Sequence, residues 1–173
     1  MTHTNDQDAR YRKAAEEFGP AMQRLARATE ANAARQHDLL QDMHVALWQS
    51  LARFDGRCSL STWVYRVTHN VAADHVRRER RQWRGLVALD TVGHMPDGRS
   101  VSAEREQADA LARIHAWIRK LGPPDRQVML LYLEQISAAD IANITGLTPG
   151  AVATRISRLK SRLASDFKET SHD

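Results

Sequence analysis

The chain has 173 residues, 42% of them hydrophobic and 27% charged, with a formal net charge of +4. These values fit a soluble globular protein with one domain or two small ones. The lone cysteine, Cys58, excludes an internal disulfide and a cysteine-based zinc site, and the scattered histidines lack the spacing of a helical metal pair, so we expect no metal and no cofactor. No apolar run approaches the ~20 residues of a membrane span. The polar N-terminus lacks the apolar core of a signal peptide, so we expect a cytoplasmic protein without membrane insertion.

Apolar positions recur at steps of three and four, which predicts an all-α chain. Residues 10–33 are predicted to form one helix, or two with a break at Gly19-Pro20. Residues 36–52 form the next helix, with a charged or polar face opposite its apolar stripe. That stripe comprises Leu40, Met43, Leu47 and Leu51, widened by Leu39 and Trp48.

A turn at 54–59 precedes a third helix, which Ser59 or Ser61 can cap. Its first half is apolar at helical spacing and its second half is rich in arginine. Residues 54–85 hold seven Lys and Arg against three Asp and Glu. The predicted buried residues of this helix are Leu60, Trp63, Val64, Val67, Val71 and Val76. Residues 85–103 lose the helical period and contain Gly, Pro and Asp-Gly, so we predict a flexible linker there.

A second helical block begins with a stripe of Leu111, Ile114, Ile118 and Leu121. Gly122 is predicted to end this helix, and Pro124 suits the first turn of the next, VMLLYL-containing helix. The stretch SAADIANITGLTPGAVATRISRLKSRL at 137–163 is typical of a helix-turn-helix: Gly146 supplies the turn and Thr148 caps the second helix. Its predicted buried face is Val152, Ile156, Leu159 and Leu163.

The second helix of this motif is the other basic part of the chain. Residues 148–173 hold five Lys and Arg against three Asp and Glu. Two separated basic sites favour a long polyanion, most simply nucleic acid. The plainer interpretation is that both are solvated helix faces, with the arginines at 77–84 complementing a helix dipole. A Gly-rich phosphate loop and a nucleophile elbow are both missing, so we expect no enzyme.

Two blocks of sequence carry a resemblance to a known family. The blocks are DLLQDMHVALWQSLARFDGRCSLSTWVYRVTHNVAADHVRRERR and LGPPDRQVMLLYLEQISAADIANITGLTPGAVATRISRLKSRL. In this order they resemble regions two and four of bacterial RNA polymerase sigma factors of the extracytoplasmic-function (ECF) type. The resemblance implies region 2 at 10–84, a linker at 85–103 and region 4 at 104–168.

The resemblance implies a promoter-specificity factor that works with core RNA polymerase and is held inactive by an anti-sigma factor. Region 2 would capture bases of the −10 promoter element in the loop from Asp55 to Ser61, and region 4 would read the −35 element. The residues expected to bind the polymerase clamp helices are Asp38, Gln41 and Asp42. Those expected at the −10 element are Arg57, Ser59, Ser61, Thr62, Trp63, Arg66, Asn70, Arg77, Arg78, Arg80 and Arg81. Those expected at the −35 element are Thr148, Pro149, Gly150, Ala151, Thr154, Arg155, Arg158, Lys160 and Arg162.

Some positions depart from the family pattern. TEANAARQH at 29–37 replaces a more acidic turn, and Ala151 and Ala153 stand where polar residues are common, which shifts weight from base contacts to phosphates and DNA shape. Because the chain stops soon after region 4, we expect no further regulatory domain. Two other interpretations stay open: a stand-alone helix-turn-helix regulator, which would not need the STW loop-helix or the acidic patch, and an adaptor module, which would not need two basic surfaces.

Overall fold

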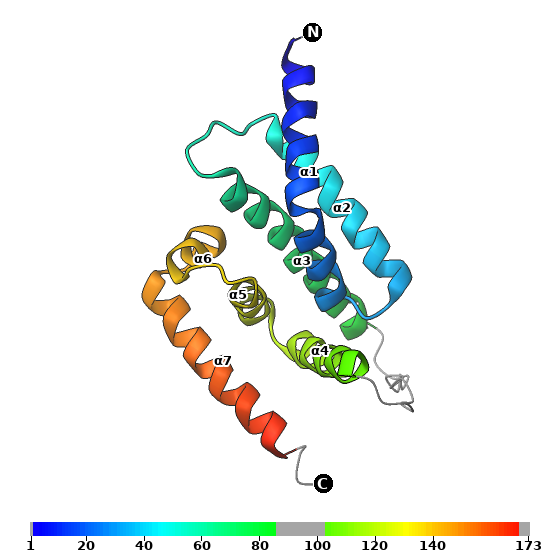
Figure 1. The fold of residues 1–173 in the computed structure, drawn as a ribbon, viewed down its shortest axis with the longest axis vertical. Helices are drawn as coiled ribbons and strands as arrows, with labels where there is room; N and C mark the ends of the chain where they lie inside the picture. Colours follow the sequence, from blue (N-terminus) through cyan, green and yellow to red (C-terminus); the bar gives the residue numbers. More distant parts are fainter. Residues whose placement is uncertain (1, 86–102, 170–173) are drawn as a thin grey trace.

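The computed structural model describes residues 2–85 and 103–169, and within these ranges it is built from seven α-helices (Figure 1). In chain order they are α1 (Thr2–Thr29), α2 (Ala33–Leu51), α3 (Leu60–Gly85), α4 (Ala103–Lys120), α5 (Pro123–Leu133), α6 (Ala138–Thr145) and α7 (Pro149–Glu169). The all-helical prediction is confirmed. Most of the predicted linker, 86–102, lies outside the described residues. Among the helices described, none is long and apolar enough to cross a membrane.

Helices α1, α2 and α3 form the first bundle. α1 is one continuous helix through Pro20, so the single helix is observed rather than the pair. Asn32 caps α2 by accepting the Arg35 backbone N–H at 3.1 Å. Ser59, and not Ser61, caps α3, because its Oγ accepts the Thr62 backbone N–H at 3.1 Å.

The core of this bundle follows the predicted stripe, except that Leu39 and not Leu40 is its first fully buried residue. Leu39 is 1% exposed, whereas Leu40 is only half-buried, and Trp48 is 39% exposed with its indole N–H donating to Asp8 at 2.8 Å. α2 meets both α1 and α3, so its buried stripe is centred on the side between them. The fully buried residues of α2 are Leu39, Met43, Leu47 and Leu51.

Helices α5, α6 and α7 contain the predicted helix-turn-helix. Gly146 adopts φ 75°, a left-handed conformation that glycine reaches without steric cost, and this ends α6. Ser137 caps α6 through the Asp140 N–H, and Thr148 caps α7 through the Ala151 N–H, at 3.1 and 3.2 Å. The local core of the motif comprises Val128, Leu131, Ile141, Ala142, Ile144 and Val152.

One predicted position in α4 is wrong. Leu111 was placed on a buried stripe but is 52% exposed, while Trp117 is buried and its indole N–H donates to Asp166 at 2.7 Å. Leu111 is exposed because it lines the hydrophobic pocket between α1, α3, α4 and α5 instead of the packed core. Ile118 and Leu121, from the predicted stripe, are fully buried.

The two halves of the chain pack against each other: α5 and α6 lie along α3, and α4 lies against α1 (Figure 1). One hydrophobic cluster spans both halves, joining Met43 and Val64 to Ile118 and Met129. Arg24 and Glu134 form a bidentate pair across the junction, at 2.6 and 2.7 Å. The separate regions predicted from sequence therefore share a core in this structure.

Arg126 is a buried charge at the junction, with 7% of its surface exposed. Its guanidinium donates to the backbone carbonyls of Arg119 and Leu121 in its own half and to that of Thr29 at 3.4 Å. Burial, together with the nearby Arg80, lowers the pKa of Arg126 to about 10. The guanidinium thus caps carbonyls at the ends of α1 and α4 at the cost of desolvation.

Candidate nucleic-acid interface

The basic face of α7 is held over α5 by a shared carboxylate. Arg155 and Arg158 both pair with Asp125, the latter at 2.8 Å. Lys160 lies over the Tyr132 ring, 5.7 Å from its centroid. Val152 and Leu159 are buried beside these side chains. The two central arginines of α7 are thus set side by side at the border of its buried face.

The start of α7 presents backbone and small side chains. Thr148, Pro149 and Gly150 are exposed and Ala151 is half-buried. The Thr154 hydroxyl donates to the Gly150 carbonyl at 2.9 Å. A helix N-terminus carries positive partial charge, and the small exposed residues here let the backbone approach a phosphate closely.

The loop before α3 gathers hydroxyl groups. Ser59 Oγ lies 2.8 Å from Ser61 Oγ and 2.9 Å from Thr62 Oγ1. The Arg57 side chain is 89% exposed and pairs with Asp55 at 3.0 Å. Donors and acceptors at the tip of an exposed loop can bind the edge of an unstacked base.

Trp63 faces inward from this loop. Its indole N–H donates to Ser50 Oγ at 3.0 Å, and its ring meets Phe54 edge to face, with centroids 5.4 Å apart. The sequence suggested both an anchoring and a DNA-binding role for this residue. The geometry corresponds to the anchoring role, because the only polar atom of the side chain is already used.

The arginines of α3 differ in their partners. Arg66 donates to the Asn143 carbonyl of α6 and Arg80 to the Leu121 carbonyl at the end of α4, both at 2.9 Å. Arg77 pairs with Asp74 at 2.6 Å, and Arg81 and Asn70 are exposed. Two predicted −10 ligands are therefore engaged by the other half of the chain.

The predicted polymerase-binding residues lie together on the exposed face of α2. Asp38, Gln41 and Asp42 are all exposed. The Asp42 carboxylate lies 3.8 Å from the Arg78 guanidinium. The acidic patch and the basic face of α3, which the sequence assigned to different partners, are thus adjacent.

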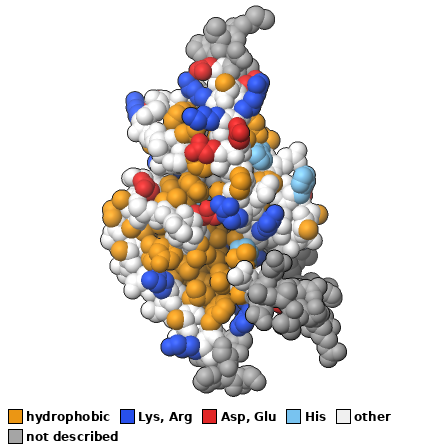
Figure 2. All heavy atoms as spheres, in the orientation of Figure 1, with side chains coloured by type: hydrophobic (Ala, Val, Ile, Leu, Met, Phe, Trp, Pro, Cys, Tyr) orange, Lys and Arg blue, Asp and Glu red, His pale blue; other side chains and the backbone are white. Residues whose placement is uncertain are grey.

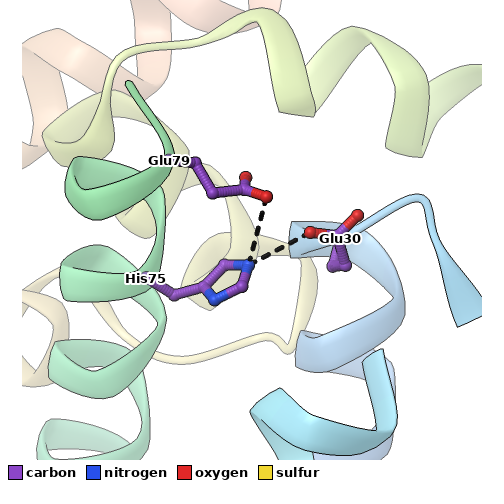
Figure 3. A group of neighbouring side chains, drawn as sticks. All are labelled: Glu30, His75 and Glu79. Carbon is purple, nitrogen blue, oxygen red and sulfur yellow. Dashed lines mark hydrogen bonds and ion pairs between the residues drawn. The ribbon is translucent and has the colours of Figure 1, made fainter. Parts of the chain in front are cut away.

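One cluster was missed at the level of sequence: Glu30, His75 and Glu79 converge where α1 ends beside α3 (Figure 3). His75 Nε2 lies 3.1 Å from Glu30 and 3.7 Å from Glu79. Burial alone would raise the pKa of Glu30, but hydrogen bonds from the Asn32 amide and His75 lower it, while burial and the neighbouring Glu30 raise the pKa of Glu79. The i, i+4 spacing of His75 and Glu79 was visible in the sequence; Glu30, 45 residues earlier than His75, was not an evident partner.

A hydrophobic pocket of about 440 Å³ lies between the two halves. Figure 2 shows hydrophobic side chains gathered on the face of the molecule seen in Figure 1. Leu111 and Leu133, at its edge, are 52% and 45% exposed. Its walls come from α1, α3, α4 and α5, including Phe18, Met22, Tyr65, Ile114 and Leu130.

A helix-turn-helix with a basic second helix, joined to a bundle whose third helix is rich in arginine, defines a DNA-binding protein of two helical regions. Comparison with protein families identifies both. Residues 14–82 match sigma-70 region 2, and residues 111–163 match sigma-70 region 4. Together they make up more than half of the chain. The chain belongs to the sigma-70 family and is an ECF-type RNA polymerase sigma factor, a class of protein without catalytic activity.

Curated relatives agree along most of the chain. The ECF RNA polymerase sigma factor SigW of Bacillus subtilis is 26% identical over 145 residues, covering 76% of this chain and 75% of the relative. The sigma factor CnrH of Cupriavidus metallidurans is 29% identical over 154 residues, covering 84% and 80%.

Solved structures share the fold. CnrH in complex with the cytosolic domain of CnrY superposes with a TM-score of 0.65 at 23% identity, covering 92% of this chain and 88% of that one. The sigma factor RpoE of Bartonella quintana, in complex with the anti-sigma factor NepR, gives 0.70 at 20% identity, covering 91% and 96%.

Proposed function

We propose that this sigma factor directs core RNA polymerase through three surfaces of its own: α7 at the −35 element, the loop and helix at 55–81 at the −10 element, and α2 on the polymerase. The observation that carries the proposal is the presence of two basic helices in separate regions, one of them in a capped helix-turn-helix. A single-site regulator needs only one of them.

At the −35 element, α7 enters the major groove by its N-terminal end. Thr148, Pro149 and Gly150 bring the backbone close to a phosphate, and Arg155 and Arg158 reach bases or phosphates on leaving Asp125. Lys160 and Arg162 flank them on the backbone. Ala151 offers no hydrogen bond, so readout at its position depends on DNA shape.

At the −10 element, the hydroxyl cluster of Ser59, Ser61 and Thr62 receives a flipped base of the non-template strand, and Arg57 neutralises a phosphate beside it. Trp63 supports this loop from below. Along α3 the other contacts are to the strand backbone, which exposed arginines bind without sequence preference. They are Arg66, Asn70, Arg77, Arg78, Arg80 and Arg81.

On the polymerase side, Asp38, Gln41 and Asp42 form a small acidic patch that suits a basic partner surface. Arg78 lies 3.8 Å from Asp42, at the boundary between this patch and the DNA-binding face. Docking of α2 therefore places α3 next to the strand that it would capture.

Promoter binding requires the two regions to move apart. Arg66 and Arg80 donate hydrogen bonds to carbonyls of region 4. While the regions are packed together, neither guanidinium can therefore use all of its donors on DNA. Residues 86–102 join the two regions and would set how far they can separate.

An anti-sigma factor is the partner that fits the hydrophobic pocket between the regions. Exposed leucines at its edge and an apolar wall suit the apolar face of an amphipathic helix. Two sigma factors of the same fold were solved with CnrY and with the anti-sigma factor NepR. A chain that works in this way with core polymerase acts in the cytoplasm.

The test is run-off transcription with core polymerase on promoter fragments from the source genome, with and without the chain. We expect transcripts from defined start sites only when the chain is added. Asp38→Ala with Asp42→Ala should lower polymerase affinity and leave duplex binding by region 4 intact; unchanged polymerase affinity would remove the docking assignment. Tight binding of the chain alone to duplex DNA, without transcripts or polymerase binding, would favour a stand-alone regulator.

A further inference from the structure

We propose that Glu30, His75 and Glu79 form a binding site for one divalent transition-metal ion of the Zn²⁺ class. The three side chains come from the end of α1 and from two successive turns of α3, and their ligand atoms all lie within 4.8 Å of one another (Figure 3). One imidazole nitrogen and two carboxylate oxygens are a donor set that Zn²⁺ accepts, with a fourth position left to water.

The spacing of the donors fits such an ion. His75 Nε2 lies 3.1 Å from Glu30 Oε2 and 3.7 Å from Glu79 Oε1. For metal–ligand bonds of about 2.0–2.1 Å, the edge of a coordination tetrahedron is about 3.3 Å, which falls between these two distances. Two of the ligands, His75 and Glu79, are held next to each other by their i, i+4 spacing on one helix.

The surroundings orient the ligands as a metal site requires. The backbone N–H of Asn32 donates to Glu30 Oε1 at 2.8 Å, which leaves Oε2 directed at His75. The Glu30 and His75 side chains are only 7% and 14% exposed, while Glu79, at 25%, opens the site toward solvent. The ligand shell is thus sheltered, held by an outer hydrogen bond and accessible from one side.

The cluster already attracts a cation. Arg35 Nη1 lies 2.7 Å from Glu79 Oε1, the same atom that faces His75, and 4.0 Å from Glu30 Oε2. Two neighbouring carboxylates repel each other unless positive charge lies between them. The Arg35 side chain is 54% exposed, so it can turn into solvent when an ion takes its place. Arg35 therefore acts as a competitor of the metal.

Metal binding would join the end of α1 to α3. Glu30 directly follows the last residue of α1, and His75 and Glu79 lie in the second half of α3. An ion held by both elements stabilises the folded state by mass action, since the unfolded chain does not hold the three ligands together. The predicted consequence is a thermal transition that rises with Zn²⁺ concentration.

For the experiment, the tag-free full chain is cleared of metal with EDTA. Binding of ZnCl₂ is measured by calorimetric titration, and the absorption spectrum of the Co²⁺-loaded chain is recorded. We expect one saturable site per chain, a tetrahedral Co²⁺ visible band, and little competition from Mg²⁺, which prefers an all-oxygen octahedral shell. His75→Asn and Glu79→Gln should each weaken binding by at least about 10-fold. His37→Asn, on an exposed histidine of α2, is the matched control and should leave it unchanged.

Arg35→Ala keeps the proposal testable if a ligand variant fails to fold. Its exposed side chain contributes little to the core, and removing the competing cation should tighten Zn²⁺ binding several-fold. Circular dichroism would confirm that each variant is folded. Absence of saturable one-to-one binding, or binding that is equally strong in folded His75→Asn and Glu79→Gln chains, would overturn the proposal. Unchanged affinity in Arg35→Ala would also count against it.

Discussion

Helices α3 and α7 are alike in sequence, since each has an apolar face and a row of arginines expected at DNA, but the two rows have different partners. In α7, Arg155 and Arg158 share Asp125, a carboxylate of the same region. In α3, Arg66 and Arg80 donate to backbone carbonyls of the other region. A carboxylate of their own motif thus holds the two arginines of region 4 in place. The two arginines of region 2 also hold the two regions together.

The cores differ in the same way. The helix-turn-helix has a local cluster around Leu131 and Ile141, while the larger cluster runs from α1 through α3 into α4, α5 and α7. The proposed −35 surface therefore has a core mostly of its own region, although Tyr65 of region 2 packs against it. The proposed −10 surface depends more on how the two regions are placed.

The largest expected effect concerns the local core of region 4. Leu131→Ala should lower the free energy of unfolding by about 2–5 kcal/mol, because a fully buried side chain is replaced by a cavity. Leu133→Ala, two residues away and 45% exposed, is the control and should change it by less than about 0.5 kcal/mol. Urea unfolding followed by circular dichroism measures both, and equal losses would mean that the cluster is not a packed core.

The next effect belongs to region 2 and depends on pH. His69 is 3% exposed, and burial lowers its pKa from 6.5 to about 3, so the folded state keeps the imidazole neutral. The unfolded chain takes up a proton below pH about 6.5. The contribution of the neutral His69 to the free energy of unfolding is therefore fully present above that pH. It is lost as the pH falls toward 3, by about 1.4 kcal/mol per pH unit.

His69→Leu should remove most of this dependence between pH 6.5 and 4.5. His37→Asn, on an exposed histidine, should keep it. Unfolding curves at a series of pH values provide the measurement. A His69→Leu chain as sensitive to pH as the parent would show that other groups cause the acid loss.

A smaller effect is expected from the two arginines of region 4. Arg155→Ala with Arg158→Ala should weaken binding to a −35 duplex by at least about 30-fold, since two specific arginine contacts of about 1–3 kcal/mol each are lost. Polymerase affinity should not change, because α2 is untouched. Lys168→Ala, in the last turn of α7, is the control. Fluorescence anisotropy with duplex DNA and with core polymerase separates the two readouts, and an equal loss in both would contradict the assignment of α7.

The smallest effect tests the junction between the regions. Glu134→Gln breaks the pair with Arg24, whose side chain is 54% exposed, so the closed arrangement should lose about 0.5–1 kcal/mol. Energy transfer between a dye on Cys58 and one on Lys168→Cys should fall. Glu17→Gln, on an exposed carboxylate of α1, should leave it unchanged. Energy transfer that is the same in Glu134→Gln and in the parent would mean that the pair does not hold the regions.

The sequence by itself determined the helical fold, the helix-turn-helix and the two basic helices. Local chemistry is enough for these: Gly146 has the conformation that only glycine adopts cheaply, Thr148 caps the next helix, and the apolar period sets the buried faces of α2 and α7. The family followed from the order of the two blocks. The exposed acidic patch on α2 was also evident, because charge at helical spacing needs no partner to be seen.

Only the tertiary structure decided which groups far apart in sequence meet. It left Leu111 exposed along the pocket between the regions, and it buried Trp117. Arg66 and Arg80 form hydrogen bonds to carbonyls of region 4 only in the folded chain. The fold also places Glu30 beside His75 and Glu79. Periodicity fixes the face of a helix but not its neighbour, since pairing between helices depends on the packing of the whole chain.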